Sequence, residues 1–289
     1  MPRLAYVNGR YAPLPAAAVH VEDRGYQFAD GAYEVVAILN GRLLDWPAHR
    51  DRLAYSLAEL GIAPPMDPRA LDSVARHLIA RNAARNALLY IQVTRGVARR
   101  DHAFPTARPA LVMTVRPFDF DARWRAAQAG VGVVLRADER WARPDIKSVS
   151  LLPNVLAKEA ARRAGAYEAW FVDRDGRVSE GSSTNAWIVT RDGVVVTRPR
   201  DGAILAGVMR ATLMRLAGDA VRVEERAFAP GEAQDAAEAF LTSTTNPCLP
   251  VVAIDGQPVG EGTPGPVTRR LRDLLWAEIG RQTGWRPPA

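Results

Sequence analysis

Two Asn-Gly dipeptides constrain the fold of this chain more than any other short feature. Asn8-Gly9 and Asn40-Gly41 each lie between short runs rich in apolar residues. This arrangement is the strongest local signal for a two-residue type I′ turn, because both turn residues need a positive φ, which Asn and Gly tolerate best. The chain is therefore expected to open with two β-hairpins.

Helical and extended patterns alternate after the second hairpin. Leu53, Leu57 and Leu60 recur at i, i+4 and i+7, which predicts a helix that ends at Gly61. The same kinds of pattern predict a second helix from Asp67-Pro68, strands at 88–94, 110–115, 131–135, 146–149, 169–172, 186–189, 194–197, 221–224, 239–242 and 251–254, and helices at 154–163, after Gly207 and after Pro264.

The order of these elements lacks the regular βαβ alternation of a doubly wound sheet, so a mixed α+β fold is expected. A length of 289 residues suits two domains. Pro117-Phe118-Asp119-Phe120-Asp121 marks the expected boundary. We expect a smaller N-terminal α+β domain over 1–117, a linker over 118–123 and a larger C-terminal α+β domain over 124–289.

The charge of the chain does not point to nucleic acid. The pI is about 9.9, but the 36 arginines are spread along the chain and interleaved with Asp and Glu. Cys248 is the single cysteine, the N-terminal residues lack the apolar core of a signal peptide, and no apolar run reaches the length of a membrane span. We therefore expect a cytoplasmic protein with no membrane or nucleic-acid partner.

Several cofactor motifs are absent from the sequence. Gly130-Val131-Gly132 begins like a dinucleotide fingerprint, but Leu135 stands where the third glycine should be, and no Gly-Lys-Ser/Thr exists for a P-loop. The four histidines have no metal-ligand spacing with Cys248 or with paired carboxylates. No metal site is expected.

Any chemistry that needs a primary amine has two candidates, Lys147 and Lys158. A lysine that forms a Schiff base must lose its proton, and apolar surroundings and nearby cations favour that loss. Lys147 lies in the short β-branched run 145–149, whereas Lys158 lies on an ordinary helical face. Lys147 is the better candidate.

Six segments resemble the fold-type IV pyridoxal-phosphate (PLP) aminotransferases, also named class IV, in the family's order and at similar spacing. Within the family the likeness is greatest to the D-amino-acid aminotransferases. The resemblance covers nearly the whole chain and implies a two-domain fold-type IV architecture, PLP as cofactor and a homodimer. The segments are Asp23–Val35, the run around Lys147, Val178–Asn185, Leu205–Arg210, Thr242–Thr245 and Ile254–Gly256.

The resemblance assigns the groups around the cofactor ring. Lys147 matches the lysine that forms the Schiff base and then moves a proton between the substrate Cα and the cofactor. Glu180 matches the carboxylate that faces the pyridine nitrogen, although its place in a Gly-Ser-rich loop fits a turn cap equally well. Leu205 matches a residue that packs against the ring, which is compatible with a core leucine.

The resemblance also assigns the phosphate site. Arg52 matches the family's phosphate arginine and is expected to bind it bidentately. Met209 stands where relatives often have Thr, so one hydroxyl contact is lost and somewhat weaker PLP binding is expected. Helix N-terminal N–H groups and hydroxyls complete the expected site, from Gly207, Val208, Met209, Ser243 and Thr244.

The substrate carboxylate is assigned to an Arg-x-His pair. Arg100 and His102, with Tyr33, match the groups that trap it in the D-amino-acid aminotransferases, and the pair comes from the neighbouring subunit there. In a strand, side chains two residues apart point the same way. Arg99 leaves open which arginine docks the carboxylate. The implied reaction moves the amino group of a D-amino acid, of D-alanine or D-glutamate type, to a 2-oxo acid by a ping-pong mechanism.

Other readings remain at this point. An L-branched-chain aminotransferase, an (R)-amine transaminase or an aminodeoxychorismate lyase of the same fold would keep Lys147 and Glu180 and change the carboxylate site. A non-enzymatic basic protein that binds nucleic acid is the remote alternative.

Overall fold

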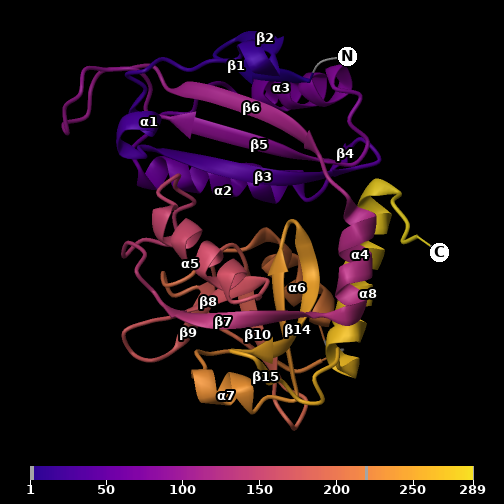
Figure 1. Cartoon of the computed structure of the whole chain (residues 1–289). Coiled ribbons are helices and arrows are strands. Elements are labelled where there is room, and N and C mark those ends of the chain that lie inside the picture. Colours follow the sequence, from indigo (N-terminus) through magenta and orange to yellow (C-terminus); the bar gives the residue numbers. More distant parts are fainter. Residues whose placement is uncertain (1–2, 219–220, 289) are drawn as a thin grey trace. The chain divides into compact units, whose positions relative to one another are not determined.

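A computed structural model describes residues 3–218 and 221–288 and divides them into two compact units (Figure 1). The first unit contains the chain up to Asp119 together with Ile146–Ser150 and Gln282–Trp285. The second contains Phe120–Asp145, Leu151–Arg281 and the residues from Arg286 onward. The chain therefore passes between the units more than once.

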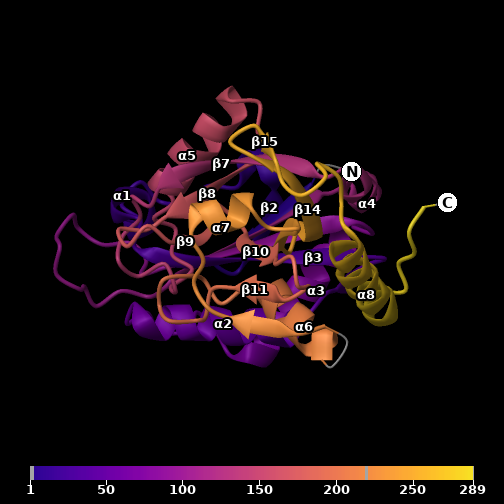
Figure 2. The ribbon, with the colours of Figure 1, turned by 90° about the horizontal axis from the view of Figure 1, so that it is seen from below.

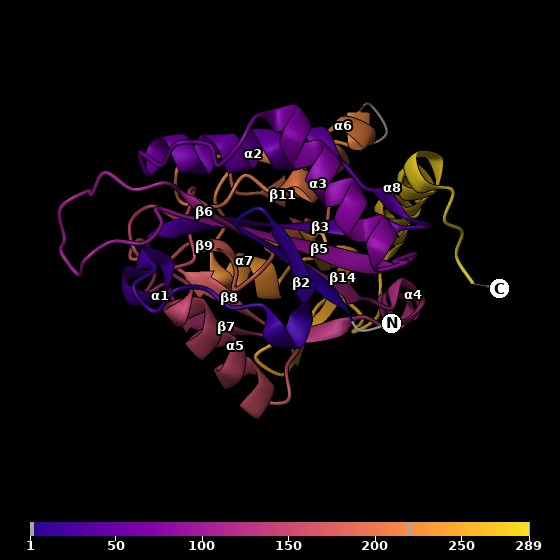
Figure 3. The same ribbon diagram turned by 90° about the horizontal axis from the view of Figure 1, so that it is seen from above.

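The first unit is built on a six-stranded antiparallel sheet in the order β2-β1-β6-β5-β3-β4. One face of this sheet is covered by two helices, α2 on β3 and α3 on β1 and β6 (Figure 3). The strands are β1 (Leu4–Val7), β2 (Arg10–Pro13), β3 (Gly31–Leu39), β4 (Arg42–Leu43), β5 (Ala87–Thr94) and β6 (Ala110–Pro117), and the helices are η1 (Leu14–Ala16), α1 (Arg24–Phe28), α2 (Trp46–Glu59) and α3 (Pro68–Arg81).

The register of β3 decides which of its side chains face the core. Val36 is opposite Leu89 and Ile38 is opposite Ala87, and all four belong to the core under α2 and α3. Because side chains alternate along a strand, Glu34 lies on this helix-covered face and Tyr33 lies on the other.

Both predicted hairpins are confirmed. Asn8 and Gly9 have φ values of 46° and 93°, and Asn40 and Gly41 have 49° and 76°, as a type I′ turn requires. The first turn joins β1 to β2, and the second joins β3 to β4.

The second unit is built on a nine-stranded mixed sheet in the order β12-β11-β10-β13-β14-β7-β8-β9, with β15 paired to β14. Helix α5 packs on β7 and β8, and α4 and α7 contact β14 (Figure 2). The strands are β7 (Val131–Ala137), β8 (Glu168–Val172), β9 (Val178–Gly181), β10 (Asn185–Val189), β11 (Val195–Thr197), β12 (Val223–Glu225), β13 (Glu238–Ser243), β14 (Asn246–Ile254) and β15 (Gln257–Pro258), and the helices are α4 (Phe120–Ala129), α5 (Leu152–Arg163), α6 (Val208–Ala217), α7 (Pro230–Gln234) and α8 (Pro266–Thr283).

Three local expectations differ from the structure. The predicted strand 146–149 is wrong, since only Ser148 forms a single bridge, to Ala32. The expected linker over 118–123 includes the first residues of a helix, because α4 begins at Phe120. Glu180 lies in strand β9 and not in a loop. Over residues 3–218 and 221–288, no helix has both the length and the apolarity needed to cross a membrane.

Candidate functional site

The backbone around Lys147 completes one edge of the first unit's sheet. The N–H of Tyr33 donates a 3.0 Å hydrogen bond to the carbonyl oxygen of Lys147, and the N–H of Val149 donates one of 3.0 Å to that of Gly31. The N–H of Lys147 donates to Oγ of Ser56, a buried residue of α2, at 3.1 Å. The sequence placed Lys147 in the second domain, but these bonds to β3 and α2 make its segment part of the first unit.

The side chain of Lys147 lies against an aromatic residue. Its Nζ is 4.3 Å from the centroid of the Tyr33 ring, and it is partly buried. The Tyr33 ring in turn lies 5.7 Å from that of Tyr90. Burial raises the pKa of the Tyr90 hydroxyl to about 12, with a smaller effect from Tyr33. Two of the predicted residues, Lys147 and Tyr33, are therefore neighbours.

Arg52 belongs to a buried group of three charged or polar side chains. Its Nε and Nη2 donate to the two carboxylate oxygens of Glu34 at 2.7 and 2.9 Å. His49 Nδ1 lies 2.7 Å from Oε2 of the same carboxylate. Burial alone would raise the pKa of Glu34, but Arg52 and the hydrogen bond with His49 lower it to about 2. Because the Nε edge of Arg52 already holds Glu34, a phosphate bound there bidentately would have to use the Nη1 and Nη2 edge.

Arg100 and His102 lie on a loop and not on a strand, so the same-face argument from strand geometry is wrong. They are nevertheless close together, because both lie on the ring of Phe28 at the end of α1. Cζ of Arg100 is 4.5 Å from the centroid of that ring, and the His102 ring is 5.5 Å away. Within the part of the chain that the structure describes, no hydrogen bond or ring contact joins either residue to Tyr33.

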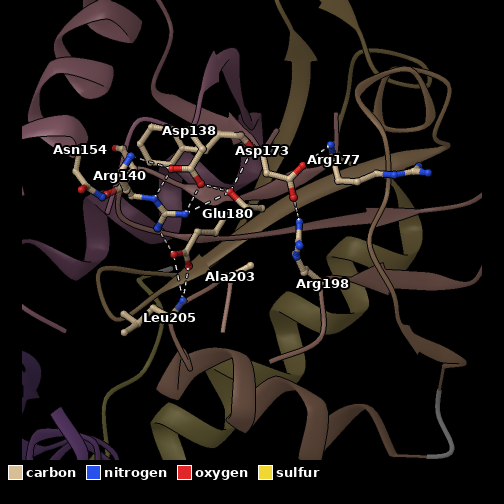
Figure 4. A network of polar contacts seen from close by, with 12 residues as sticks. Asp138, Arg140, Asn154, Asp173, Arg177, Glu180, Arg198, Ala203 and Leu205 are labelled. Atoms are coloured by element: carbon tan, nitrogen blue, oxygen red, sulfur yellow. Dashed lines mark hydrogen bonds and ion pairs between the residues drawn. The ribbon is translucent and has the colours of Figure 1, made fainter. Parts of the chain in front are cut away.

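Glu180 is the centre of a polar network in the second unit (Figure 4). It is 5% exposed, and its carboxylate accepts hydrogen bonds from the backbone N–H of Leu205 at 3.1 Å and from Nδ2 of Asn185 at 3.0 Å. Arg140 Nη1 forms a short ion pair with it. These donors hold the carboxylate in a fixed orientation beside a cation.

Arg140 links Glu180 to a second carboxylate. Its Nε and Nη2 donate to the two oxygens of Asp138 at 2.9 and 2.7 Å. Burial alone would raise the pKa of Asp138, but the hydrogen bonds and charge of Arg140, with help from Ser179, lower it. The same two carboxylates raise the pKa of Arg140 despite its burial. The network therefore alternates in sign from Asp138 through Arg140 to Glu180.

Asn185 brings three predicted residues of the second unit together. Its Nδ2 donates to Glu180 and also to the carbonyl oxygen of Leu205, at 3.1 Å. Its Oδ1 lies so close to Gly207 that a Cβ there would be 2.0 Å away. Asn185, the first residue of β10, is also opposite Thr242 of β13. Ser243, the last residue of β13, therefore lies at the same end of these two strands.

The start of α6 has the properties of an anion site. Gly207 is its N-cap, no side chain caps it, and Val208 and Met209 are buried. The first N–H groups of a helix have no partner within the helix and attract anions such as phosphate. This uncapped and buried helix start fits the phosphate of the expected cofactor. Ser243 and Thr244 lie at the end of β13, with Oγ of Ser243 bonded to the N–H of Asn246 at 3.1 Å.

Sequence reasoning missed five residues of these groups. The role of each depends on burial or on a partner distant in the sequence, and neither can be recognised from the residues next to it in the chain. They are Glu34, His49, Asn185, Asp138 and Arg140. Glu34 carried one usable signal, since a charged residue inside the apolar run 31–39 indicates a buried partner.

Comparisons with known proteins identify similar chains. A family model for amino-transferase class IV matches residues 31–254. The D-alanine aminotransferase of Bacillus licheniformis is 40% identical over 277 residues, which cover 96% of this chain and 97% of that protein. The branched-chain amino acid aminotransferase of Escherichia coli superposes with a TM-score of 0.89 at 24% identity, covering 98% of this chain and 96% of that chain. A hypothetical aminotransferase from Mycobacterium tuberculosis, in its PLP-bound form, gives a TM-score of 0.81 at 21% identity and covers 98% of this chain and 100% of that chain.

Proposed function

The chain belongs to the class IV aminotransferase family, and from that premise we propose that it is a PLP-dependent transaminase that moves the amino group of a D-amino acid to a 2-oxo acid. The 40% identity to a D-alanine aminotransferase over 96% of the chain carries the proposal. The branched-chain enzyme of Escherichia coli shares the fold at only 24% identity, so it does not favour an L-specific reaction.

The groups proposed to hold PLP are an anion site, a carboxylate and an apolar side chain. The phosphate would bind to the first N–H groups of α6 at Gly207, Val208 and Met209, to Ser243 and Thr244, and to Arg52. Glu180 would receive the protonated pyridine nitrogen, and Leu205 would pack against the ring. Bound PLP supplies an electron sink that stabilises negative charge at the substrate Cα.

Lys147 is proposed as the covalent attachment point and the base. Its Nζ would remove the proton from the substrate Cα in one half-reaction and return it in the other. The hydrogen bonds of its backbone to β3 and α2 fix where the side chain begins. The contact with the Tyr33 ring limits where Nζ can move.

Arg140 and Asn185 are proposed to position the Glu180 carboxylate for its interaction with the pyridine nitrogen. Arg140 forms an ion pair with the carboxylate, and Asn185 and the N–H of Leu205 fix its orientation. An ionised carboxylate next to the ring nitrogen favours the protonated ring, which is the better electron sink.

Arg100, His102 and Tyr33 are proposed to bind the substrate α-carboxylate. A guanidinium and an imidazole on one platform offer two donors to the two oxygens of a carboxylate. If the carboxylate is bound at a single position in the active site, the Cα–H of only one enantiomer faces Lys147. The enzyme would then discriminate between D- and L-substrates.

A homodimer is proposed as the working form. Leu152, Val155 and Leu156 on α5 are 67%, 58% and 58% exposed and follow one another at i, i+3 and i+4. Such an apolar stripe on a helix is typical of an interface. The cytoplasmic location expected from the sequence stays a prediction.

Steady-state kinetics with 2-oxoglutarate as acceptor test the function. We expect kcat/KM for D-alanine to exceed that for L-alanine and L-leucine by at least about 100-fold. A preference for L-leucine, (R)-phenylethylamine or aminodeoxychorismate would contradict the proposal and identify one of the related activities. The cofactor assignment is tested by incubating the protein with PLP and removing the unbound cofactor. Absence of the absorbance of a Schiff base between PLP and the protein would contradict that assignment.

A further inference from the structure

Residues 95–109 form the long loop between β5 and β6 that carries the proposed carboxylate-binding pair, Arg100 and His102 (Figure 1). The two ends of this loop are held together at Gly96. Gly96 has a φ of +101°, and a Cβ at this position would lie 2.0 Å from the carbonyl oxygen of Arg108. The loop therefore leaves the sheet from a narrow and fixed base.

A partly buried carboxylate lies next to this base and joins two arginines. Asp30 accepts 2.8 Å hydrogen bonds from Nε of Arg24 and from Nε of Arg95. The side chains of the three residues are 12%, 4% and 8% exposed. Burial alone would raise the pKa of Asp30, but its hydrogen bonds with Arg95 and Arg24 lower it. The group is a charged cluster in which one carboxylate holds two guanidinium groups.

Each arginine of this cluster also binds the loop. Arg24 Nη1 donates to the carbonyl oxygen of Asp101, the residue between the two members of the pair. Cζ of Arg95 lies 3.6 Å from the ring centroid of Phe104. Arg95 Nη2 also donates to the carbonyl oxygen of Leu60 at 2.7 Å, which ties the cluster to the end of α2. The backbone of the pair is thus fixed from its buried side.

The side chains of the pair rest on one ring. Phe28 has Cζ of Arg100 4.5 Å from its centroid and the His102 ring 5.5 Å away at 45°. On the same ring, Cζ of Arg24 lies at 4.8 Å. Arginine and aromatic faces attract through the ring quadrupole. Arg100 and His102 are themselves exposed, and besides this ring only a long hydrogen bond from Nη1 of Arg100 to the carbonyl oxygen of Gln27, at 3.5 Å, restrains either side chain among the residues described.

We propose that Phe28 is a positioning residue that holds Arg100 and His102 in the conformation that receives the substrate α-carboxylate. The inference rests on the proposed function, because it presumes that this pair binds a carboxylate. Phe28 does not touch the substrate in this proposal. It acts through the two side chains that lie on it, while Arg24 fixes the ring and the loop backbone together.

The expected kinetic signature follows from conformational entropy. Exposed Arg and His side chains occupy several rotamers, and ordering them on binding reduces affinity. A platform that restricts them before the substrate arrives lowers that cost. Because the carboxylate is bound alike in the ground and transition states, loss of the platform should raise KM and leave kcat unchanged.

The test compares Phe28→Leu, Phe28→Tyr and Tyr26→Leu in the purified holoenzyme, with D-alanine as the varied substrate. Tyr26 lies on the same helix and is 79% exposed, so it is a matched aromatic control. We expect Phe28→Leu to raise KM roughly threefold to tenfold. Phe28→Tyr keeps the ring and should restore a KM within about twofold of the unchanged protein, as should Tyr26→Leu. In all three, kcat should stay within about twofold.

A double-mutant cycle with Arg100→Gln separates positioning from general destabilisation. In the Arg100→Gln background, Phe28→Leu should raise KM much less than it does alone, because the ring has lost a main partner. Additive effects of the two substitutions, or an unchanged KM in Phe28→Leu, would overturn the proposal. An unchanged KM in Arg100→Gln would overturn it as well, because the pair would then not bind the carboxylate.

Failure of the inference differs from failure of the proposed function. If the function is wrong, the unchanged protein does not transfer amino groups from D-alanine. If only the inference is wrong, the unchanged protein is active and Arg100→Gln raises KM, while Phe28→Leu behaves like Tyr26→Leu.

Discussion

The two lysines of the chain differ in what surrounds their amines. Lys158 Nζ lies 3.6 Å from Oε1 of Glu168, a carboxylate with no exposed surface, and so has a structural partner. Lys147 Nζ lies over the Tyr33 ring, and no ion pair joins it to a carboxylate among the residues described. At the scale of single residues, this difference supports the proposal that Lys147, and not Lys158, carries the chemistry.

Replacing each lysine with arginine tests this difference under matched conditions. Arginine cannot release its proton in a protein, so Lys147→Arg should lower kcat for D-alanine and 2-oxoglutarate by at least about 1,000-fold. Lys158→Arg keeps the cation beside Glu168 and should stay within about twofold of the unchanged rate. Circular dichroism should show both variants folded. Turnover retained by Lys147→Arg would remove it from the mechanism.

Arg140 is expected to act through Glu180. Arg140→Gln leaves the carboxylates of Asp138 and Glu180 without the cation between them. The dissociation constant of PLP, measured by fluorescence titration of the cofactor-free protein, should rise about tenfold, which corresponds to about 1.4 kcal/mol. Arg136→Gln, an exposed arginine of β7, is the control and should leave the constant unchanged. Equal constants in both variants would show that Glu180 does not need Arg140.

At the scale of elements, Glu34 joins β3 to α2. Glu34→Gln should leave Arg52 buried without its carboxylate and lower the free energy of unfolding by about 3 kcal/mol at neutral pH. The effect should depend on pH. The pKa of Glu34 is about 2 in the folded protein against 4.5 for the free group, so its stabilisation is present above 4.5 and is lost as the pH falls toward 2.

Urea unfolding of both proteins between pH 7 and pH 4 measures this dependence. The difference in unfolding free energy should be constant near neutral pH and begin to narrow below about pH 4.5. Ser73→Ala is the control, because the Ser73 hydroxyl is exposed on α3 and donates to the backbone carbonyl oxygen of Arg69 within the same helix. Its effect should not follow this profile. If the difference in unfolding free energy between the unchanged protein and Glu34→Gln increased as the pH was lowered, the role of the Glu34 carboxylate would be contradicted.

Elements with local signals could be predicted from the sequence, and elements set by distant partners could not. The Asn-Gly hairpins and the helix through Leu53, Leu57 and Leu60 depend on residues close in the chain, and all are present. The stretch 146–149 contains the β-branched residues Ile146 and Val149, which favour a strand, but it pairs with β3 only through the bridge at Ser148. Helix α1 has five residues, too few to show a period. The pairing of Arg140 with Glu180 joins residues forty positions apart.

At the scale of the whole molecule, the arginine content has a structural meaning that composition hides. Arg24, Arg52, Arg95, Arg210 and Arg272 are all less than 10% exposed. A guanidinium stays charged when buried, so each needs acceptors inside the protein. Part of the positive charge that gives the chain its net charge of +6 is therefore buried inside the protein.

The apolar stripe of α5 predicts how the chain associates. Val155→Glu places a charge among Leu152 and Leu156 and should shift the protein from dimer to monomer in sedimentation velocity at micromolar concentration. Ala164→Glu, at the exposed end of α5, is the control and should leave the dimer intact. An unchanged sedimentation coefficient for Val155→Glu would exclude this stripe from the interface.

The segment Ile146–Ser150 belongs to the first unit although the chain before and after it belongs to the second. A gene fragment that stops at Asp119 would encode the six-stranded sheet without the five residues that complete its edge, and without Lys147. The units are thus not interchangeable modules: recombination at the 119/120 junction would separate the candidate base from the strand that holds its backbone.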